Sequence, residues 1–166
     1  MEMNIRRAEI ADAHAIANIL IELGWFAHMD QGFHSAMPAR VESHLRFCIS
    51  GEDHSVYVAE NKDKDVLGYT SVHWIPCMFL PGPEGYMTEL FIKESGRGKG
   101  IGGSLLAVVE QEAKERGCSR LMLLNGRHRE SYKRGFYKKH GWEERDKLAP
   151  FVFMLMEFNP AGSDVR

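Results

Sequence analysis

The segment from Glu89 to Leu106, ELFIKESGRGKGIGGSLL, constrains the fold of this chain more than any other stretch. A loop with five glycines and three cations joins a short apolar run to a segment whose apolar residues recur at helical spacing. A strand that enters a helix through such a turn is typical of anion sites, where backbone NH groups and the positive end of the helix converge. The segment therefore predicts an α/β fold with a phosphate-binding turn near its centre.

Composition and charge narrow the class of protein. The chain has 166 residues, 44% hydrophobic and 27% charged, which is typical of one globular domain. A net charge of -2 gives no overall electrostatic reason to bind nucleic acid or an anionic membrane. No apolar run has the length of a membrane span, and the first residues lack the apolar core of a signal peptide. We therefore expect a cytoplasmic protein without a membrane or nucleic-acid partner.

Cysteines and histidines give no sign of a metal site or a disulfide framework. The three cysteines form no C-x-x-C pair, and the eight histidines include no H-E-x-x-H motif. We expect the cysteines to be small core residues and assign no metal. His73 lies on a predicted strand, where it either faces an acceptor cleft or is a packed or surface residue.

Apolar periodicity and turn residues divide the chain into alternating element types without repeats. Helices are expected at 11–23, 39–49, 101–116 and 130–141, and strands at 3–8, 55–61, 66–75, 86–92, 119–125, 142–146 and 149–158. The sequence thus predicts a single α/β (α+β) domain over residues 1–158. Its sheet is mixed, mostly antiparallel and seven-stranded, with about four helices. Residues 159–166 are expected to form a flexible C-terminal tail.

Two common phosphate-binding motifs fit the glycine-rich turn poorly. A Walker A loop needs a lysine followed by Ser or Thr after its second glycine, and no such pair occurs here. Gly98, Gly100 and Gly103 do spell the dinucleotide pattern G-x-G-x-x-G. The next strand, however, ends in Asn125 and not in the acidic residue that would hold a ribose hydroxyl. Dinucleotide binding is therefore a weak alternative.

A third pattern matches the turn more fully. Arg97, Gly100 and Gly102 spell R-x-x-G-x-G, and LFIKESGRGKGIGGSLL resembles the acetyl-CoA loop of the GNAT superfamily of N-acetyltransferases. The opening IRRAEIADAHAIANIL and the later FYKKHGW are also similar to segments of that family. The resemblance implies a GNAT-like fold, acetyl-CoA as co-substrate, and direct acetyl transfer to an amine in a ternary complex. The residues that it places at acetyl-CoA are Phe91, Ile92, Arg97, Gly98, Lys99, Gly100, Ile101, Gly102, Gly103 and Asn125.

The same resemblance assigns three catalytic groups. Glu89, on the strand that enters the loop, would take the proton of the acceptor amine. The backbone NH of Ile92 would donate a hydrogen bond to the oxyanion of the tetrahedral intermediate. Tyr137, in FYKKHGW, would protonate the CoA thiolate as it leaves.

The acceptor is expected to be a small-molecule or peptide amine. Two aromatic, breaker-rich stretches, GWFAHMDQGFHSAMP and HWIPCMFLPGPEG, flank core elements and are expected to form its pocket. Apolar side chains would surround its carbon body, and a carboxylate would meet a cationic end. The residues expected in these roles are Trp25, Phe26, Trp74 and Phe79 for the first, and Asp30 and Glu84 for the second.

Two other functions are kept open. The fold could serve a non-catalytic acyl-CoA-binding or sensor domain. Six cations interleaved with Tyr132, Phe136 and Tyr137 in residues 127–140 could instead form a stacking surface for RNA. A homodimer is compatible with either.

Overall fold

The computed structural model describes residues 3–24 and 31–145, with side chains from residue 34 in the second range. The chain forms two compact units, Met1–Asn125 and Gly126–Arg166. The first unit contains the sheet and the glycine-rich turn. The second contains two short helices.

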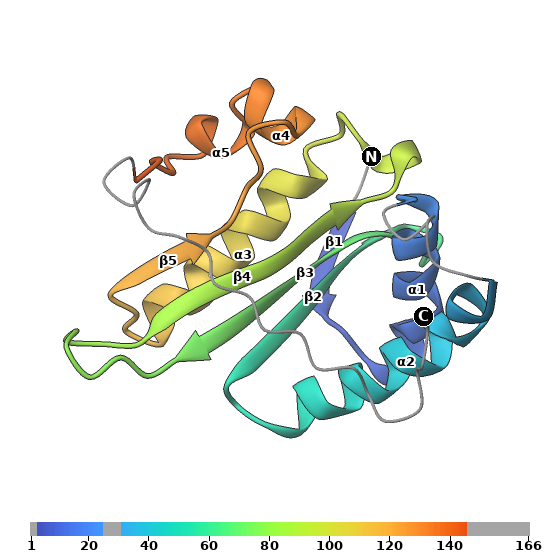
Figure 1. The fold of residues 1–166 in the computed structure, drawn as a ribbon, viewed down its shortest axis with the longest axis horizontal. Helices are drawn as coiled ribbons and strands as arrows, with labels where there is room; N and C mark the ends of the chain where they lie inside the picture. The colour runs from blue at the N-terminus through green and yellow to red at the C-terminus, as the bar shows by residue number, and fades with distance from the viewer. Residues whose placement is uncertain (1–2, 25–30, 146–166) are drawn as a thin grey trace, which may run out of the picture. The chain divides into compact units, whose positions relative to one another are not determined.

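One sheet of five strands organises the first unit (Figure 1). Its strands follow chain order, so each strand lies beside the next one in sequence. Neighbours from β1 to β4 are antiparallel, and β5 runs parallel to β4. The strands are β1 (Met3–Arg7), β2 (His54–Asn61), β3 (Val66–Ile75), β4 (Glu84–Ile92) and β5 (Arg120–Leu123).

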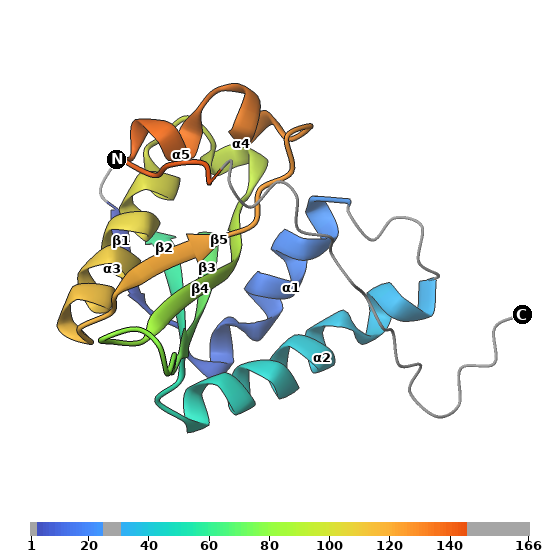
Figure 2. The same ribbon diagram turned by 60° about the vertical axis from the view of Figure 1, so that its left-hand side comes forward.

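Helices cover both faces of this sheet. The helices α1 (Ala13–Glu22) and α2 (Gln31–Ser50) lie on one face, and α3 (Ile101–Glu115) lies on the other (Figure 2). Short 3-10 turns, η1 (Ile10–Asp12) and η2 (Glu94–Gly96), precede α1 and the glycine-rich turn. The residues that pack between α1, α2 and the sheet are Ala8, Ala13, Ile16, Ile19, Leu45, Val58, Val66 and Tyr69. The residues that pack beneath α3 are Ala59, Leu67, Val72, Trp74, Ile101, Leu105, Val109 and Ala113.

The helix α2 begins eight residues earlier than expected and contains Pro38. A proline in an aromatic, breaker-rich stretch favours a loop, because a mid-helix proline removes a backbone hydrogen bond. Met37 and Leu45 are nevertheless almost fully buried. Packing of this face therefore outweighs the local preference for a break.

The expected counts of seven strands and four helices are wrong for the described residues, which hold five strands and five α-helices. No strand forms over residues 142–145, and the strand expected at 149–158 lies outside the described residues, as does the expected tail. The helix expected at 130–141 is split into α4 (Glu130–Lys133) and α5 (Phe136–Lys139). Gly135, between them, has a left-handed backbone with φ 63°, which ends one helical turn and starts the next.

The second unit is held by aromatic and ionic contacts of its own. Arg127 forms an ion pair with Glu144, and the Tyr132 hydroxyl donates a hydrogen bond of 2.8 Å to the same carboxylate. The ring of Tyr137 makes edge contacts with Phe136 and Trp142, with centroids 5.0 and 6.0 Å apart. Part of the basic, aromatic segment at 127–140 is thus engaged in local contacts.

Candidate functional site

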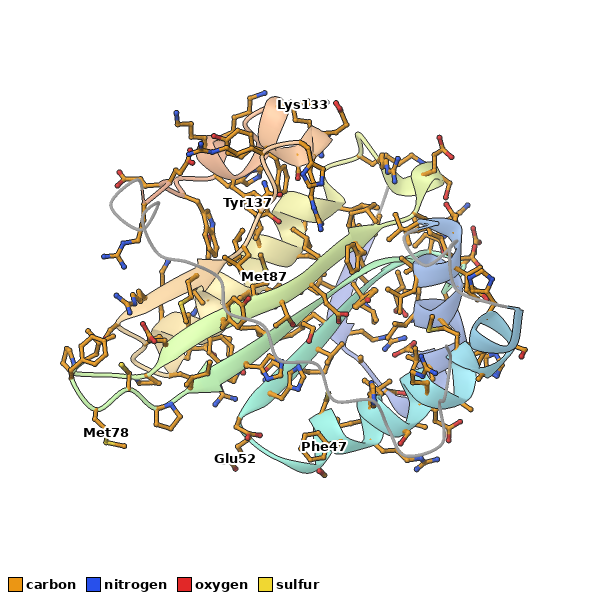
Figure 3. All side chains as sticks on the ribbon, viewed as in Figure 1. Phe47, Glu52, Met78, Met87, Lys133 and Tyr137 are labelled. Carbon is orange, nitrogen blue, oxygen red and sulfur yellow. The ribbon has the colours of Figure 1, made fainter. Side chains whose placement is uncertain are left out.

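The strands β4 and β5 are paired over only part of their length. Parallel pairing begins at Glu84 and Arg120 and ends at Met87 and Leu123. The antiparallel pairing of β4 with β3 continues to Ile92. Beyond Met87, labelled in Figure 3, β4 therefore has a strand neighbour on one side only among the described residues. This leaves an open backbone edge that runs toward the glycine-rich turn.

The ladder geometry shows which backbone groups line this open edge. The NH of Lys93 donates to the carbonyl of Leu67 at 2.8 Å, and the Glu89 carbonyl accepts from the Thr70 hydroxyl at 2.8 Å. Backbone groups of Glu89 and Lys93 thus face β3. Because successive residues of a strand alternate in direction, the NH groups of Leu90 and Ile92 face the opposite side. The Ile92 NH, expected from the sequence to serve as a donor, lies on the open edge.

A β-bulge lies at the beginning of the open edge. Ser71 of β3 is paired with Glu89, but the next residue, Val72, is paired with Met87. Thr88 is therefore the extra residue of β4, and its hydroxyl lies 3.5 Å from the Ser71 hydroxyl. A bulge bends its strand and redirects the side chains beside it. As a result, Met87 and Glu89 lie on opposite faces of the sheet. Val72, the partner of Met87, packs beneath α3, whereas Glu89 lies on the face of α1 and α2.

Glu89 is a partly buried carboxylate whose environment favours its protonated form. Burial raises its pKa, and the nearby hydroxyl of Tyr69 lowers the pKa by a smaller amount. The net effect is a raised pKa, because burial removes water from the charged carboxylate and the Tyr69 hydroxyl replaces only part of the lost stabilisation. A carboxylate with this property is a better proton acceptor near neutral pH than an exposed glutamate.

Four further side chains lie on this side of the sheet and were not predicted together. His54 of β2 is paired with His73 of β3, and the Nε2 of His54 lies 2.7 Å from the Ser71 hydroxyl. Burial, followed by the charge of His73, lowers the pKa of His54 to about 4, so this ring is neutral at pH 7. Cys48 of α2 has a raised pKa because of burial and of the Glu89 charge. The alternation of side chains along β3 could have predicted that Tyr69, Ser71 and His73 share one face. It could not have predicted that His54 of β2 and Cys48 of α2 lie beside them.

The glycine-rich turn is packed tightly at one end and open at the other. A Cβ on Gly96 would lie 3.0 Å from Ile101 Cδ1 and 3.1 Å from Ile92 Cγ2, so this glycine lets the turn pack against β4 and α3. Gly98 and Gly100 have left-handed backbones, with φ 75° and 80°. A side chain at either position would meet open space, so glycine is favoured there by its backbone conformation alone.

The turn has the features of an anion site. Gly100 precedes α3 without a side-chain cap, so the NH groups of the first helical turn, which includes Ile101, Gly102 and Gly103, have no partner within the helix. Arg97 and Lys99 are exposed and form no ion pair with the described residues. Both cations thus remain available beside the positive end of α3.

The residues expected to contact the acceptor are scattered. Trp25, Phe26 and Asp30 lie outside the described residues. Trp74 is buried beneath α3, where its indole NH donates to the Ser55 hydroxyl at 2.8 Å. Glu84 is buried in an ion pair with Arg120. Phe79 is 77% exposed in the β3–β4 connection, next to Met78 (Figure 3). The structure does not bring Trp74, Phe79 or Glu84 together with Glu89.

The last two expected site residues lie at and beyond the end of the first unit. Asn125 follows β5 and is the final residue of that unit. Tyr137 belongs to α5 of the second unit, where burial raises its pKa and Arg129 lowers it by less.

A cavity of about 270 Å³ lies at the C-terminal end of α2 and shares Cys48 and His54 with the side of the sheet that carries Glu89. It is lined by Arg7, Ala8, Leu45, Cys48, Ile49, Gly51, Glu52, His54, Val56 and Arg116. Its two arginines are paired with Glu112, and Glu52 adds a second carboxylate, so its charges are nearly balanced. Phe47, labelled near Glu52 in Figure 3, is 78% exposed. The cavity does not include the open edge of β4.

The described ranges, 3–24 and 31–145, hold neither a candidate metal site nor a helix that could span a membrane. They contain no group of three or more His, Cys, Asp or Glu side chains placed to hold a metal ion. None of the helices in these ranges is both long enough and apolar enough to cross a membrane.

Comparisons with known proteins agree with this arrangement. The model of the acetyltransferase (GNAT) family matches residues 20–142. The uncharacterized N-acetyltransferase YhfO of Bacillus subtilis (strain 168) is 27% identical over 145 residues, covering 86% of this chain and 91% of that protein.

Solved structures share the fold. The crystal structure of a transcriptional regulator from Bacillus halodurans C-125 has a TM-score of 0.78 at 21% identity, with coverage of 95% of this chain and 100% of that one. The glucosamine-6-phosphate N-acetyltransferase of Arabidopsis thaliana has a TM-score of 0.72 at 22% identity, with coverage of 96% and 100%.

Proposed function

The chain belongs to the acetyltransferase (GNAT) family, and from this premise we propose that it transfers the acetyl group of acetyl-CoA directly to an amine in a ternary complex. The observation that carries the proposal is the segment of β4 beyond Met87, which carries Glu89, has an open edge and leads directly into the glycine-rich turn. One strand thus joins a candidate base to a candidate anion site.

The turn and the open edge provide complementary contacts for acetyl-CoA. The pyrophosphate would accept hydrogen bonds from the NH groups at the start of α3, with Arg97 and Lys99 adding charge at the rim. Phe91 and Ile92 would flank the pantetheine arm along β4. Its amides can pair with the edge groups that β5 leaves free, as an added strand would. We include Asn125, at the end of β5, in the same contact set.

The chemistry needs an acid, a base and an oxyanion donor. Glu89 takes a proton from the acceptor nitrogen, which then attacks the thioester carbonyl and forms the C–N bond. The Ile92 NH donates to the oxyanion, a contact of a kind that contributes about 3 kcal/mol to transition-state stabilisation. The C–S bond breaks as the oxyanion collapses, and Tyr137 gives its proton to the leaving thiolate. The nitrogen of the tetrahedral intermediate loses its second proton to solvent as the amide forms. Tyr137 is reprotonated from solvent, and Glu89 releases to solvent the proton that it took from the acceptor ammonium.

We propose a small-molecule or peptide amine as the acceptor. The Arabidopsis relative acts on a phosphorylated amino sugar, as its name states, and shares 22% identity with this chain. The face that carries Glu89 in this chain also presents Ser71, His73 and His54. These neutral hydrogen-bonding groups suit a polar acceptor better than a purely aliphatic one.

A thiol-release assay over a panel of amines, with acetyl-CoA as donor, tests the proposed function. We expect at least one panel member to give amine-dependent release of CoA and an acetylated product identifiable by mass. Calorimetry on the same sample measures acetyl-CoA binding independently. Tight binding without turnover of any amine would indicate a CoA-binding domain instead of an enzyme.

A further inference from the structure

Two tyrosines on the sheet approach two glutamates, and only one pair is fully hydrogen-bonded. On the α3 face, the Tyr57 hydroxyl donates to Glu112 Oε2 at 2.9 Å. On the opposite face, the Tyr69 hydroxyl lies close enough to Glu89 to lower its pKa, yet it makes no hydrogen bond of normal geometry with any described residue. The first pair is a satisfied core contact, and the second is not.

Strand pairing fixes the relation between Tyr69 and Glu89. Tyr69 is paired with Phe91, and the two rings meet edge to face with centroids 5.7 Å apart. Glu89 is two residues before Phe91 on β4, so it is the diagonal neighbour of Tyr69 on the same face. Tyr69 is 2% exposed, and its hydroxyl is the only buried side-chain polar atom without a partner among the described residues.

A buried hydroxyl without a partner destabilises a fold, and phenylalanine would fill this position without that cost. Such a group is therefore explained best by a role in the bound state. Hydrogen bonds in catalytic sites are often long before the substrate binds and shorten in the complex.

We propose that Tyr69 is a positioning residue for Glu89: its hydroxyl donates a hydrogen bond to the carboxylate when the acceptor is bound, and so fixes the carboxylate's orientation and keeps it ionised. This inference rests on the proposed function, in which Glu89 is the base. The proton of the acceptor nitrogen moves to Glu89, and Tyr69 keeps its own proton throughout. Burial and the Glu89 charge raise the pKa of Tyr69 well above its usual value. A hydroxyl with a raised pKa keeps its proton, as the proposed role requires.

The electrostatic surroundings of Glu89 support a scheme in which Glu89 accepts the proton and Tyr69 only positions Glu89. Among the described residues, Tyr69 from β3 and Cys48 from α2 are the titratable groups that interact with it. The pair of His54 and His73 lies beyond Ser71 on the same face. Burial raises the pKa of Glu89, and Tyr69 is the neighbour that lowers it. Loss of the hydroxyl should therefore raise the Glu89 pKa further.

The substitution Tyr69→Phe tests the proposal, with Tyr57→Phe as the matched control. A charge-assisted hydrogen bond of this kind corresponds to a change of about 10- to 100-fold, so we expect kcat at pH 7 to fall by that factor in Tyr69→Phe. The KM for acetyl-CoA should not change. The acidic limb of the pH profile of kcat/KM should move to higher pH in Tyr69→Phe but not in Tyr57→Phe.

A second readout needs no activity. With ¹³C-labelled glutamate, the titration midpoint of the Glu89 carboxyl, identified by its absence in Glu89→Gln, should rise in Tyr69→Phe and stay unchanged in Tyr57→Phe. Incorporation of 3-fluorotyrosine, a stronger donor that preserves the fold, should lower the same midpoint. Equal midpoints in wild type, Tyr69→Phe and the fluorinated protein would overturn the proposal. Because these titrations need no substrate, they decide it even where the amine panel gives no turnover.

Discussion

The imidazole of His54 on β2 stacks on that of His73 on β3, with ring centroids 3.9 Å apart. Burial and the charge of His73 lower the pKa of His54 to about 4. In the unfolded chain the pKa of this histidine is about 6.5. Between pH 6.5 and pH 4 the unfolded chain therefore binds a proton at His54 that the native state does not bind. Folding stability contributed by the neutral ring is therefore present above pH 6.5 and is lost as pH falls toward 4.

The first prediction is that His54→Asn makes the free energy of unfolding less dependent on pH. Because the ring is only partly buried, we expect the wild type to lose about 1–2 kcal/mol more than the variant between pH 7.5 and pH 4.5. Urea unfolding at several pH values measures this difference. His44→Asn, on an exposed part of α2, is the control and should follow the wild type. Parallel curves for wild type and His54→Asn would contradict the prediction.

The second prediction concerns Glu89 as the base. Glu89→Gln keeps the size of the side chain but removes its basicity, so the rate at pH 7 should fall by about 10²- to 10⁴-fold. The rate should recover partly at high pH, where the acceptor is already a free amine. A pH–rate profile identical to that of wild type would remove Glu89 from the mechanism. Glu52→Gln, an exposed change at the end of α2 (Figure 3), is the control.

The third prediction concerns the start of α3. Gly102→Asp places a negative side chain in the first helical turn, where the pyrophosphate is proposed to bind, and should weaken acetyl-CoA binding about 100-fold or more. Ala107→Asp adds the same charge at an exposed position farther along α3 and should bind normally. Calorimetry measures both affinities, with circular dichroism to check folding. Equal affinities in the two variants would exclude the turn as the anion site.

The fourth prediction separates packing from acid catalysis at Tyr137. Tyr137→Phe keeps the ring contacts with Phe136 and Trp142 but removes the proton donor. The single-turnover rate should fall by about 10²- to 10⁴-fold while the Kd for acetyl-CoA stays the same. Tyr132→Phe, which removes a hydroxyl bonded to Glu144, should lower stability slightly and leave the chemical step unchanged. A wild-type single-turnover rate in Tyr137→Phe, with chemistry limiting, would assign the proton to another donor.

Local elements were predictable because their causes lie close together in the chain. The bounds of β3 and the start of α3 at Ile101 agree with the apolar periodicity of their own residues. Gly98, Gly100 and Gly117 take left-handed backbones where turns or helix ends were expected, since glycine has no Cβ to oppose them. The break at Gly135 has the same local cause, although the sequence pattern predicted one continuous helix there.

The arrangement of the site depended on contacts between distant residues. Period-two alternation is compatible with either face of a strand, and only the observed register sets Glu89 beside Tyr69 and sends Trp74 beneath α3. The extra residue Thr88 and the early end of the β4–β5 pairing have no local signature, because both depend on which residues of two strands meet.

The sequence by itself determined the glycine-rich turn, its cations and the strand and helix that flank it, because backbone conformation and apolar spacing are properties of neighbouring residues. Tertiary structure alone decided three features of the described residues: β4 keeps an open edge, His54 stacks on His73, and the Tyr69 hydroxyl is buried beside Glu89 without a hydrogen bond of normal geometry. These features arise from packing and strand pairing between residues far apart in the chain, where long-range burial and register outweigh any local preference.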